Sequence, residues 1–385
     1  TFDDPTVIDP IYTPSINDID DGSVILTLTA FANGSCVDVS DDMTLTITPQ
    51  ATVYAGEDAE ICETAGSYFL YDATAEDYSS LLWTTSGDGI VDDASLMNAT
   101  YTHGSNDLGT TVTLSLTAYA LGSCTDVSDD MELTINLQAT AYAGADAEIC
   151  ESAGSYTIAD ATASNYASLL WTTSGDGLFD DPTLLNPTYT PGLNDLNNGD
   201  VTLSLTAFAN GSCADVTDEM VLTITAAPFA YAGEDAEICE TAGSYLLYDA
   251  LAEDYASLLW TTSGDGAFDD ATIQNPVYTP GSGDITTGSV TLTLTAYGNG
   301  SCTDVSDDMI LTITLQATAY AGADAEICET GSYQVPDATA TNYSSILWTT
   351  SGTGTFNDPT LIDPIYTPCI YDIDDGSVVL SLTAY

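Results

Sequence analysis

The chain has 385 residues, of which 59 are Asp or Glu, none is Lys or Arg and one is His, so its formal net charge is −59 at pH 7. Nothing in such a chain can neutralise phosphate groups, and an anionic lipid surface would repel it. Nucleic acid is therefore excluded as a direct partner, and no direct membrane insertion is expected. The simplest interpretation of the charge is a solvated acidic surface suited to saline surroundings.

One sequence unit of about 89 residues recurs along the chain. The repeats carry β-type signals throughout, which predicts an all-β, elongated tandem array of immunoglobulin-like β-sandwich domains. We place partial repeats at residues 1–50 and 317–385, and complete repeats at 51–138, 139–227 and 228–316. Because the chain starts and stops inside a unit, we expect it to be a window of a longer repetitive protein.

The strands of the repeat at 51–138 can be followed in chain order. Leu81-Leu82-Trp83 begins a strand whose tryptophan is expected in the core, and Ser86-Gly87-Asp88-Gly89 then turns the chain. Apolar residues alternate with Thr and Ser in residues 111–118, and alternation returns in 131–135, which predicts two half-buried strands. The four tryptophans expected in the cores are Trp83, Trp171, Trp260 and Trp348.

Between the last two strands, other repeats carry Asn-Gly, as in Asn210-Gly211 and Asn299-Gly300. Asn-Gly tolerates positive φ at both central positions of a turn, so it predicts a two-residue hairpin of type I′. Apolar residues nowhere recur at spacings of three and four over a helix length. Helix content is therefore predicted to be near zero.

Eight of the nine cysteines recur at two positions of the repeat, in the motifs Ile-Cys-Glu and Gly-Ser-Cys. Such pairs in an all-β repeat indicate disulfides, and hence an oxidising extracellular setting, more than buried free thiols. Two connectivities stay open. Pairing Cys62 with Cys213 would staple successive repeats and agrees better with sandwich geometry, whereas pairing within a unit lets each repeat fold alone. We slightly favour the bridges within a unit, which are Cys62–Cys124, Cys150–Cys213 and Cys239–Cys302.

The ninth cysteine, Cys369, stands where other repeats have Ser15, Gly104, Gly192 or Gly281. It lies in a turn after Tyr-Thr-Pro. An exposed extra thiol could cross-link chains, but an idle cysteine in a divergent repeat is the simpler interpretation.

Carboxylates cluster at three recurring places, and hard cations such as Ca²⁺ prefer several oxygen ligands on irregular loops. One cluster follows the tryptophan strand, as in Asp88, Asp92 and Asp93. The other two lie before the final strand and on the linker, where calcium could stiffen a junction between domains. The candidate calcium ligands are Asp126, Asp129, Asp130, Asp146, Asp215, Asp218, Asp235, Asp304 and Asp307. No segment has the spacing of an EF-hand or a calcium-binding nonapeptide repeat.

No residue pattern indicates an enzyme. His103 occurs in one unit only, so no repeated catalytic triad or histidine metal site is possible. Paired carboxylates are abundant, but a small sandwich offers no deep cleft in which one acid would be specialised.

The motifs AYAGADAEICE, SLLWTTSGDG, DPTLLNPTYTPG and GSCTDVSDDM resemble the tandem PKD/immunoglobulin-like repeats of giant cell-surface adhesins of Bacteroidetes, including the SprB-type gliding-motility adhesins. The resemblance covers the whole chain. It implies an extracellular filamentous protein that is exported by the type IX secretion route and attached to the outer membrane.

Residues and resemblance together predict a structural stalk segment of a long surface adhesin, used for attachment or gliding motility. Its expected partners are the neighbouring repeats, surface polysaccharide bound weakly many times over, and the motility or secretion machinery of the cell envelope. One alternative is a self-assembling filament or sheath with strand exchange between chains. A second is a set of carbohydrate-binding repeats of a secreted hydrolase.

Overall fold

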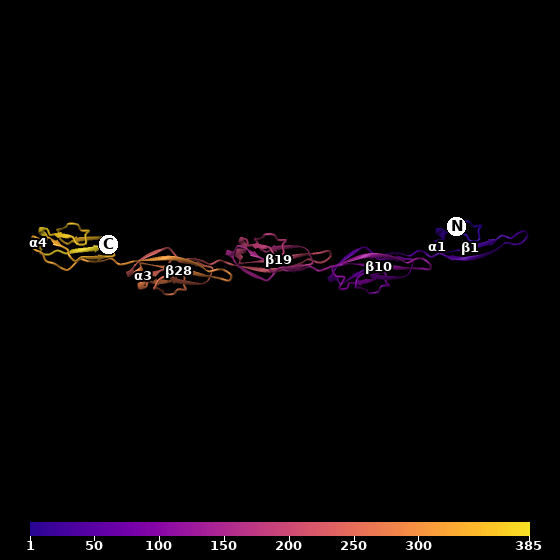
Figure 1. Cartoon of the computed structure of the whole chain (residues 1–385), viewed down its shortest axis with the longest axis horizontal. Coiled ribbons are helices and arrows are strands. Elements are labelled where there is room, and N and C mark those ends of the chain that lie inside the picture. The colour runs from indigo at the N-terminus through magenta and orange to yellow at the C-terminus, as the bar shows by residue number, and fades with distance from the viewer. The chain divides into compact units, whose positions relative to one another are not determined.

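A computed structural model describes residues 1–385, and it confirms the predicted all-β fold of tandem immunoglobulin-like β-sandwiches (Figure 1). The chain divides into two compact units. The first contains residues 1–147 and 155–222, and the second contains residues 148–154 and 223–385. No helix of the chain combines the length and the apolar character needed to cross a membrane.

The repeat at 51–138 lies in the first unit and forms three sheets, with strand orders β4-β11-β10-β7, β5-β9-β8 and β3-β6. Its elements are β3 (Thr52–Tyr54), β4 (Ala59–Cys62), the 3₁₀ turn η1 (Glu63–Ala65), β5 (Ser67–Phe69), β6 (Thr74–Glu76), β7 (Tyr78–Thr85), β8 (Ile90–Val91), β9 (Thr100–Thr102), β10 (Thr111–Ala120) and β11 (Val127–Asn136). Strand β4 runs parallel to β11, so the first part of the repeat is tied to its last strand.

The repeat that follows has the same elements in the same order, with one short helix in addition. They are β12 (Thr140–Tyr142), β13 (Ala147–Cys150), η2 (Glu151–Ala153), β14 (Tyr156–Thr157), β15 (Thr162–Ser164), β16 (Tyr166–Thr173), β17 (Leu178–Phe179), β18 (Thr188–Thr190), the helix α2 (Leu193–Asn198), β19 (Asp200–Ala209) and β20 (Val216–Thr225). Within the first unit, β12 pairs with β15, β18 pairs with both β14 and β17, and β16 pairs with β19.

The repeat at 228–316 lies in the second unit, with sheets β22-β29-β28-β25, β23-β27-β26 and β21-β24. Its elements are β21 (Phe229–Tyr231), β22 (Ala236–Cys239), η3 (Glu240–Ala242), β23 (Tyr245–Leu246), β24 (Leu251–Glu253), β25 (Tyr255–Thr262), β26 (Ala267–Phe268), β27 (Val277–Thr279), α3 (Ser282–Thr287), β28 (Ser289–Gly298) and β29 (Val305–Thr314).

The two partial repeats have fewer elements. Residues 1–50 contain α1 (Ile16–Asp20), β1 (Ser23–Ala30) and β2 (Val39–Thr46). Residues 317–385 contain β30 (Thr318–Tyr320), β31 (Tyr333–Gln334), β32 (Thr339–Thr341), β33 (Ile346–Thr350), β34 (Thr355–Phe356), β35 (Ile365–Thr367), α4 (Ile370–Asp375) and β36 (Leu380–Ala384). The largest sheet is reduced to the pair β1-β2 in the first and to the pair β33-β36 in the second.

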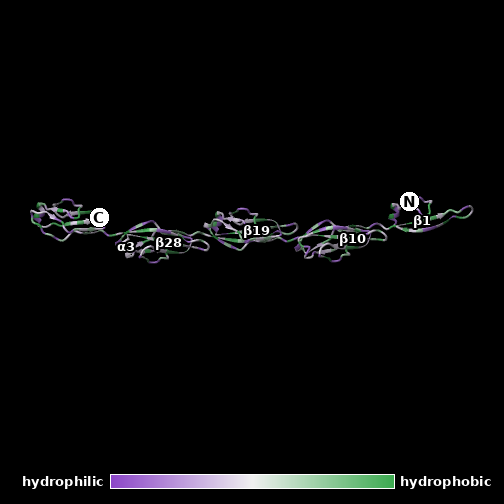
Figure 2. Cartoon of the chain, in the orientation of Figure 1, coloured by the Kyte–Doolittle hydropathy of each residue, from purple (hydrophilic) through white to green (hydrophobic).

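Alternation of apolar and polar residues builds the cores, and both kinds of residue are interspersed along every repeat (Figure 2). In β10, Leu114 and Leu116 are buried while the residues between them face outward, so the strand predicted at 111–118 is confirmed. Met131 on β11 lies opposite Leu114 and is also buried. The four tryptophans each have 2% of their surface exposed, and the indole nitrogen of Trp83 donates to the carbonyl oxygen of Leu96 at 3.1 Å.

The prediction of a two-residue type I′ hairpin is wrong. Strand β19 ends at Ala209 and β20 begins at Val216, so the connection is a longer loop. The reason is Asp215, whose carboxylate accepts a hydrogen bond from the Ala209 N–H at 2.8 Å and closes the loop at its base. Gly211 has φ of 54° within this loop, which we call the hairpin tip (residues 210–215).

The prediction of almost no helix missed four short helices, α1 to α4, each of which follows a Tyr-Thr-Pro segment. In α2, one buried carboxylate organises the segment. Asp195 accepts hydrogen bonds from the Tyr189 hydroxyl at 2.7 Å and from the Gly192 N–H at 2.9 Å. Asp107, Asp284 and Asp372 occupy the same place in other repeats. The carboxylate thus ties the start of the segment to a core tyrosine in each of these repeats, including the repeat at 51–138, where no helix follows.

Burial of Asp195 disfavours its charged form, but the Tyr189 hydroxyl and the backbone N–H groups of Gly192, Asp176 and Gly177 outweigh that effect and hold its pKa below the usual value. The partner tyrosine shifts the other way. Burial and the adjacent carboxylate of Asp195 raise the pKa of Tyr189 to about 12. Asp195 is therefore ionised, and Tyr189 protonated, across the physiological pH range.

Replacing Asp195 with Asn is expected to lower the free energy of unfolding by about 1–3 kcal/mol at neutral pH, because several buried donors lose a charged acceptor. A carboxylate with a lowered pKa stabilises the folded state above its unfolded-state pKa, and that stabilisation is lost as the pH falls through the folded-state pKa. The difference between the wild type and the variant is thus expected to be constant at neutral pH and to shrink once the pH falls below the ordinary value of 3.8. Calorimetry at a series of pH values measures it.

The matched control is Asp200→Asn, because Asp200 is exposed at the start of β19. Its unfolding should match that of the wild type within about 0.5 kcal/mol. Equal destabilisation by the two substitutions would show that the buried carboxylate has no special role.

Candidate functional site

Two disulfides join the three complete repeats in succession. Cys62 is bonded to Cys213 in the first unit, with Cα atoms 4.7 Å apart. Cys150 is bonded to Cys302 in the second unit, with Cα atoms 4.8 Å apart. Each bond links the Ile-Cys-Glu cysteine of one repeat to the Gly-Ser-Cys cysteine of the next, and we call the surroundings of such a bond a stapled junction.

The bridges favoured within a unit, Cys62–Cys124, Cys150–Cys213 and Cys239–Cys302, are therefore wrong. Cys62 ends β4, and the parallel pairing of β4 with β11 places it opposite Asn136, at the end of the repeat. Cys124 precedes β11, which begins at Val127. The length of β11, about 30 Å at roughly 3.3 Å per residue, separates the two cysteines. The staple between successive repeats, which was the alternative, is the one observed.

Polar contacts reinforce the staple in the first unit. The side-chain amide of Gln138, on the linker, donates to the carbonyl oxygen of Ala214 in the hairpin tip at 2.7 Å. The Gln138 N–H donates to the Glu63 carboxylate at 2.9 Å, and the sulfur of Cys213 lies 3.4 Å from the carbonyl oxygen of Asn136. The linker is thus held to both repeats that it connects.

In the second unit, a glutamate makes the polar contacts beside the disulfide. The carboxylate of Glu148 accepts hydrogen bonds from the Ser301 N–H at 3.0 Å and from the Thr225 hydroxyl at 2.8 Å. Gly300 has φ of 51°, which favours glycine, and a side chain there would have to displace this carboxylate. Neither Gln138 nor Glu148 was singled out from the sequence for this role. Their recurrence, as in Gln50, Gln316, Glu60 and Glu237, was the available signal.

Two further cysteines have surroundings like those of the bonded cysteines but form no disulfide. The sulfur of Cys124 lies 3.3 Å from the carbonyl oxygen of Thr48 and has no bonded partner. The sulfur of Cys239 lies 3.5 Å from the side-chain oxygen of Gln316, just as Cys62 lies 3.4 Å from Gln138. The remaining free thiols are the exposed Cys36 and Cys328 and the half-buried Cys369. Cys369 immediately precedes α4, where its N–H donates to Asp372 at 3.0 Å.

The calcium candidates act in the structure as acceptors of backbone hydrogen bonds. Asp126, Asp215 and Asp304 each close a hairpin tip. Asp129, Asp218 and Asp307 each bind the N–H of an alanine ahead of the Ile-Cys-Glu segment, while Asp146 and Asp235 bind the last strand of their repeats. Asp130 is exposed.

These carboxylates are not brought together. The structure contains no group of three or more His, Cys, Asp or Glu residues that could hold a metal ion. Specific calcium binding stays a prediction, and every candidate carboxylate except the exposed Asp130 already accepts a backbone hydrogen bond in the fold of its own repeat.

No protein-family model matches the chain, and no curated protein sequence matches it. Among solved structures, the chain is similar to an I-band fragment of titin, with 10% identity over 70% of this chain and 99% of the other and a TM-score of 0.44. It is similar to a fragment of mouse cadherin-23, with 16% identity over 70% and 99% of the two chains and a TM-score of 0.33. A fragment of protocadherin gamma B2 gives 10% identity over 82% and 91%, with a TM-score of 0.33.

The double variant Cys62→Ser/Cys213→Ser is expected to lose about 2–5 kcal/mol of unfolding free energy, because the disulfide no longer restricts the unfolded chain. Calorimetry without reductant measures the loss. Cys369→Ser is the control and should leave the unfolding free energy unchanged within about 0.5 kcal/mol. A double variant as stable as the wild type would mean that the staple adds nothing to stability.

Calcium and magnesium at equal concentration are expected to raise the unfolding temperature to a similar extent, because both screen the repulsion among carboxylates. Thermal unfolding in matched chloride salts is the measurement. A rise with calcium alone, removed by Asp218→Asn but not by Asp130→Asn, would instead establish a specific site.

Proposed function

We propose that this chain is a load-bearing stalk segment of an extracellular surface protein. The observation that carries the proposal is the disulfide between successive complete repeats, because a covalent bond across a junction resists tension along the chain. Disulfides of this kind persist in oxidising surroundings outside the cytosol.

The two disulfides interleave along the sequence. Cys62 bonds to Cys213, while Cys150, which lies between them, bonds to Cys302. The shortest covalent path from Cys62 to Cys302 crosses the first disulfide to Cys213, follows the chain back to Cys150 and then crosses the second disulfide. A repeat that unfolds under tension can therefore release only part of its length while the bonds hold.

The large negative charge of the chain also suits a stalk. Every charged side chain is acidic except for one histidine, so repeats repel one another and resist collapse and association. Each repeat adds length while it touches only its neighbours, which makes reach proportional to the number of repeats.

The finer assignment rests on the resemblance of the repeats to those of Bacteroidetes adhesins. On that basis we propose attachment to the outer membrane, export by the type IX route and a part in surface attachment or gliding motility. Outward-facing threonines, such as Thr113 on β10, form a polar surface that suits weak, repeated contact with polysaccharide. The proposal assigns no catalytic role to the chain.

Stretching single chains by their termini tests the load-bearing role. The span between Cys62 and Cys302 should extend to about 220 Å in the oxidised protein and to about 800 Å after reduction, at about 3.4 Å per residue. Variants that lack one disulfide should extend to an intermediate limit of about 300 Å, because the remaining bond still shortens the covalent path. Variants that lack both should extend like the reduced protein.

The control is Cys369→Ser, which should extend like the wild type in both states. Equal extension of the oxidised and reduced wild type would contradict the proposal, because the disulfides would then carry no tension.

A further inference from the structure

The first complete repeat is crossed from one end to the other by two extended segments that lie side by side. Strand β4 pairs in parallel with β11, and further bonds join the same two stretches of chain. The Ala55 N–H donates to the Asp129 carboxylate at 2.8 Å, and the Glu132 N–H donates to the Asp58 carboxylate at 2.8 Å. Residues 51–62 therefore follow the last strand of the repeat in the same direction.

Neither of these segments contains a slack loop. At the two ends of the repeat, the side-chain amide of Gln50 donates to the carbonyl oxygen of Thr125 at 2.6 Å, and the Gln138 N–H donates to the Glu63 carboxylate at 2.9 Å. The partners in all of these bonds are 74 or 75 residues apart in the sequence. Because β11 is one continuous strand of ten residues, the segment beside it covers the same distance with the same number of residues and is equally extended.

The next repeat has the same arrangement. The Ala143 N–H donates to the Asp218 carboxylate at 2.8 Å, and the Val221 N–H donates to the Asp146 carboxylate at 2.8 Å. The partners are again 75 residues apart. The last strand of this repeat, β20, is also continuous over ten residues.

The first disulfide connects an extended segment of one repeat to an extended segment of the next. Cys62 ends β4, and Cys213 lies just before β20. We call the covalent path from Thr52 through this disulfide to Val221 the disulfide route. It takes ten backbone steps from Thr52 to Cys62 and eight more from Cys213 to Val221, whereas the chain itself takes 169.

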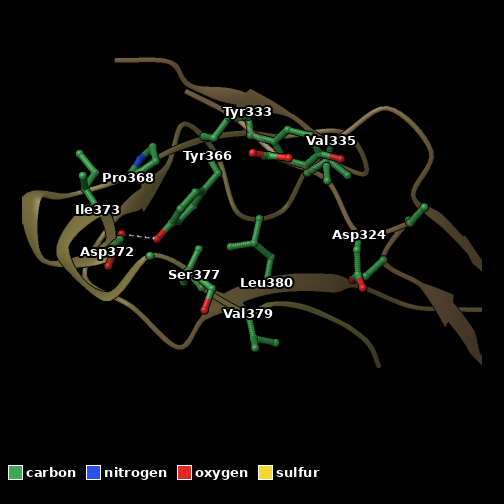
Figure 3. Close-up of a pocket in the computed structure, with 18 of the residues that line it drawn as sticks. Asp324, Tyr333, Val335, Tyr366, Pro368, Asp372, Ile373, Ser377, Val379 and Leu380 are labelled. Atoms are coloured by element: carbon green, nitrogen blue, oxygen red, sulfur yellow. Dashed lines mark hydrogen bonds between the residues drawn. The ribbon is translucent and has the colours of Figure 1, made fainter. Parts of the chain in front are cut away.

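The rest of each repeat lies outside this route. Residues 63–124 of the first complete repeat include Tyr101 and Asp107, which are both buried. The Tyr101 hydroxyl donates to the Asp107 carboxylate at 2.7 Å, and Figure 3 shows the equivalent bond between Tyr366 and Asp372 in another repeat. Contacts of this kind stabilise the fold, but the disulfide route does not pass through the residues that make them.

We propose that this arrangement separates the bearing of tension from the folding of the repeats. Tension between Thr52 and Val221 is carried by the disulfide route, while the interiors of the two repeats, residues 63–124 and 155–212, are not stretched. Extended strands rise about 3.3 Å per residue and cannot exceed about 3.6 Å, so the route can lengthen by only about a tenth. This inference rests on the proposed stalk role and goes beyond it, because the reach of the stalk then does not depend on whether the interiors stay folded.

The state of the disulfide decides which residues are stretched. When the bond between Cys62 and Cys213 is reduced, the only covalent path between Thr52 and Val221 is the chain itself. Tension then passes through the non-covalent contacts of the junction and of both interiors, which unfold when those contacts break. In the oxidised protein, unfolding of an interior releases no length between the same two points.

The experiment stretches single full-length chains by azide-bearing side chains introduced at the exposed positions of Thr52 and Val221. The oxidised span should approach a limit of about 65 Å without steps, and the reduced span should lengthen in steps to about 570 Å, at about 3.4 Å per residue. Leu116→Ala removes a fully buried side chain of the first interior. It should lower the melting temperature and the unfolding force of the reduced protein but leave the extension curve of the oxidised protein unchanged.

Two matched insertions of about 20 Gly and Ser residues make the comparison independent of stability. An insertion after the exposed Ser105, outside the route, should leave the oxidised span unchanged. The same insertion between the exposed Glu57 and Asp58, on the route, should lengthen the oxidised span by about 70 Å.

Equal lengthening of the oxidised span by the two insertions would overturn the proposal. So would a step of more than about 20 Å in the oxidised wild type, because the folded route would then contain slack. If that step appears while reduction still lengthens the span, the stalk role stands and only the separation of tension from folding fails. Equal extension of the wild type in both redox states would contradict both.

Discussion

The constraint on which this structure depends is the absence of any Lys or Arg to balance its carboxylates. Carboxylates that take part in the fold must be stabilised by N–H and O–H donors. Asp215 closes a hairpin tip through a backbone N–H, and Asp195 holds a helix, a turn and a tyrosine together. Hydrogen bonds to an ionised acceptor are stronger than neutral ones, so a few such residues in each repeat can fix the loops.

The hairpin tips that these carboxylates close take part in the junctions between repeats. Closure by Asp215 leaves Gly211 and Cys213 at the end of a long two-stranded projection, in contact with the linker and with Cys62. The parallel pairing of β4 with β11 places Cys62 where that projection arrives. The junction is therefore the product of two sheet registers, and the disulfide secures a contact that the strands have already aligned.

The same registers explain the two partial repeats. Because the last strand of a repeat lies between its first strand and its hairpin partner, a repeat without that strand keeps a groove, and the strand without its neighbours keeps an exposed methionine. Trp348 and Tyr366 remain buried in the partial repeat at 317–385, so its core is well formed on one side and open on the other.

The sequence by itself determined the all-β fold, the period, the alternating strands and the buried tryptophans, because periodicity and side-chain type act locally and repeat without change. It also limited the cysteine pairing to two schemes. Tertiary structure alone decided between them, since the distance from Cys62 to Cys124 or to Cys213 depends on which end of a strand each residue occupies. It likewise decided the roles of Gln138 and Glu148, whose partners are far apart in the sequence and meet only when the strands are in register.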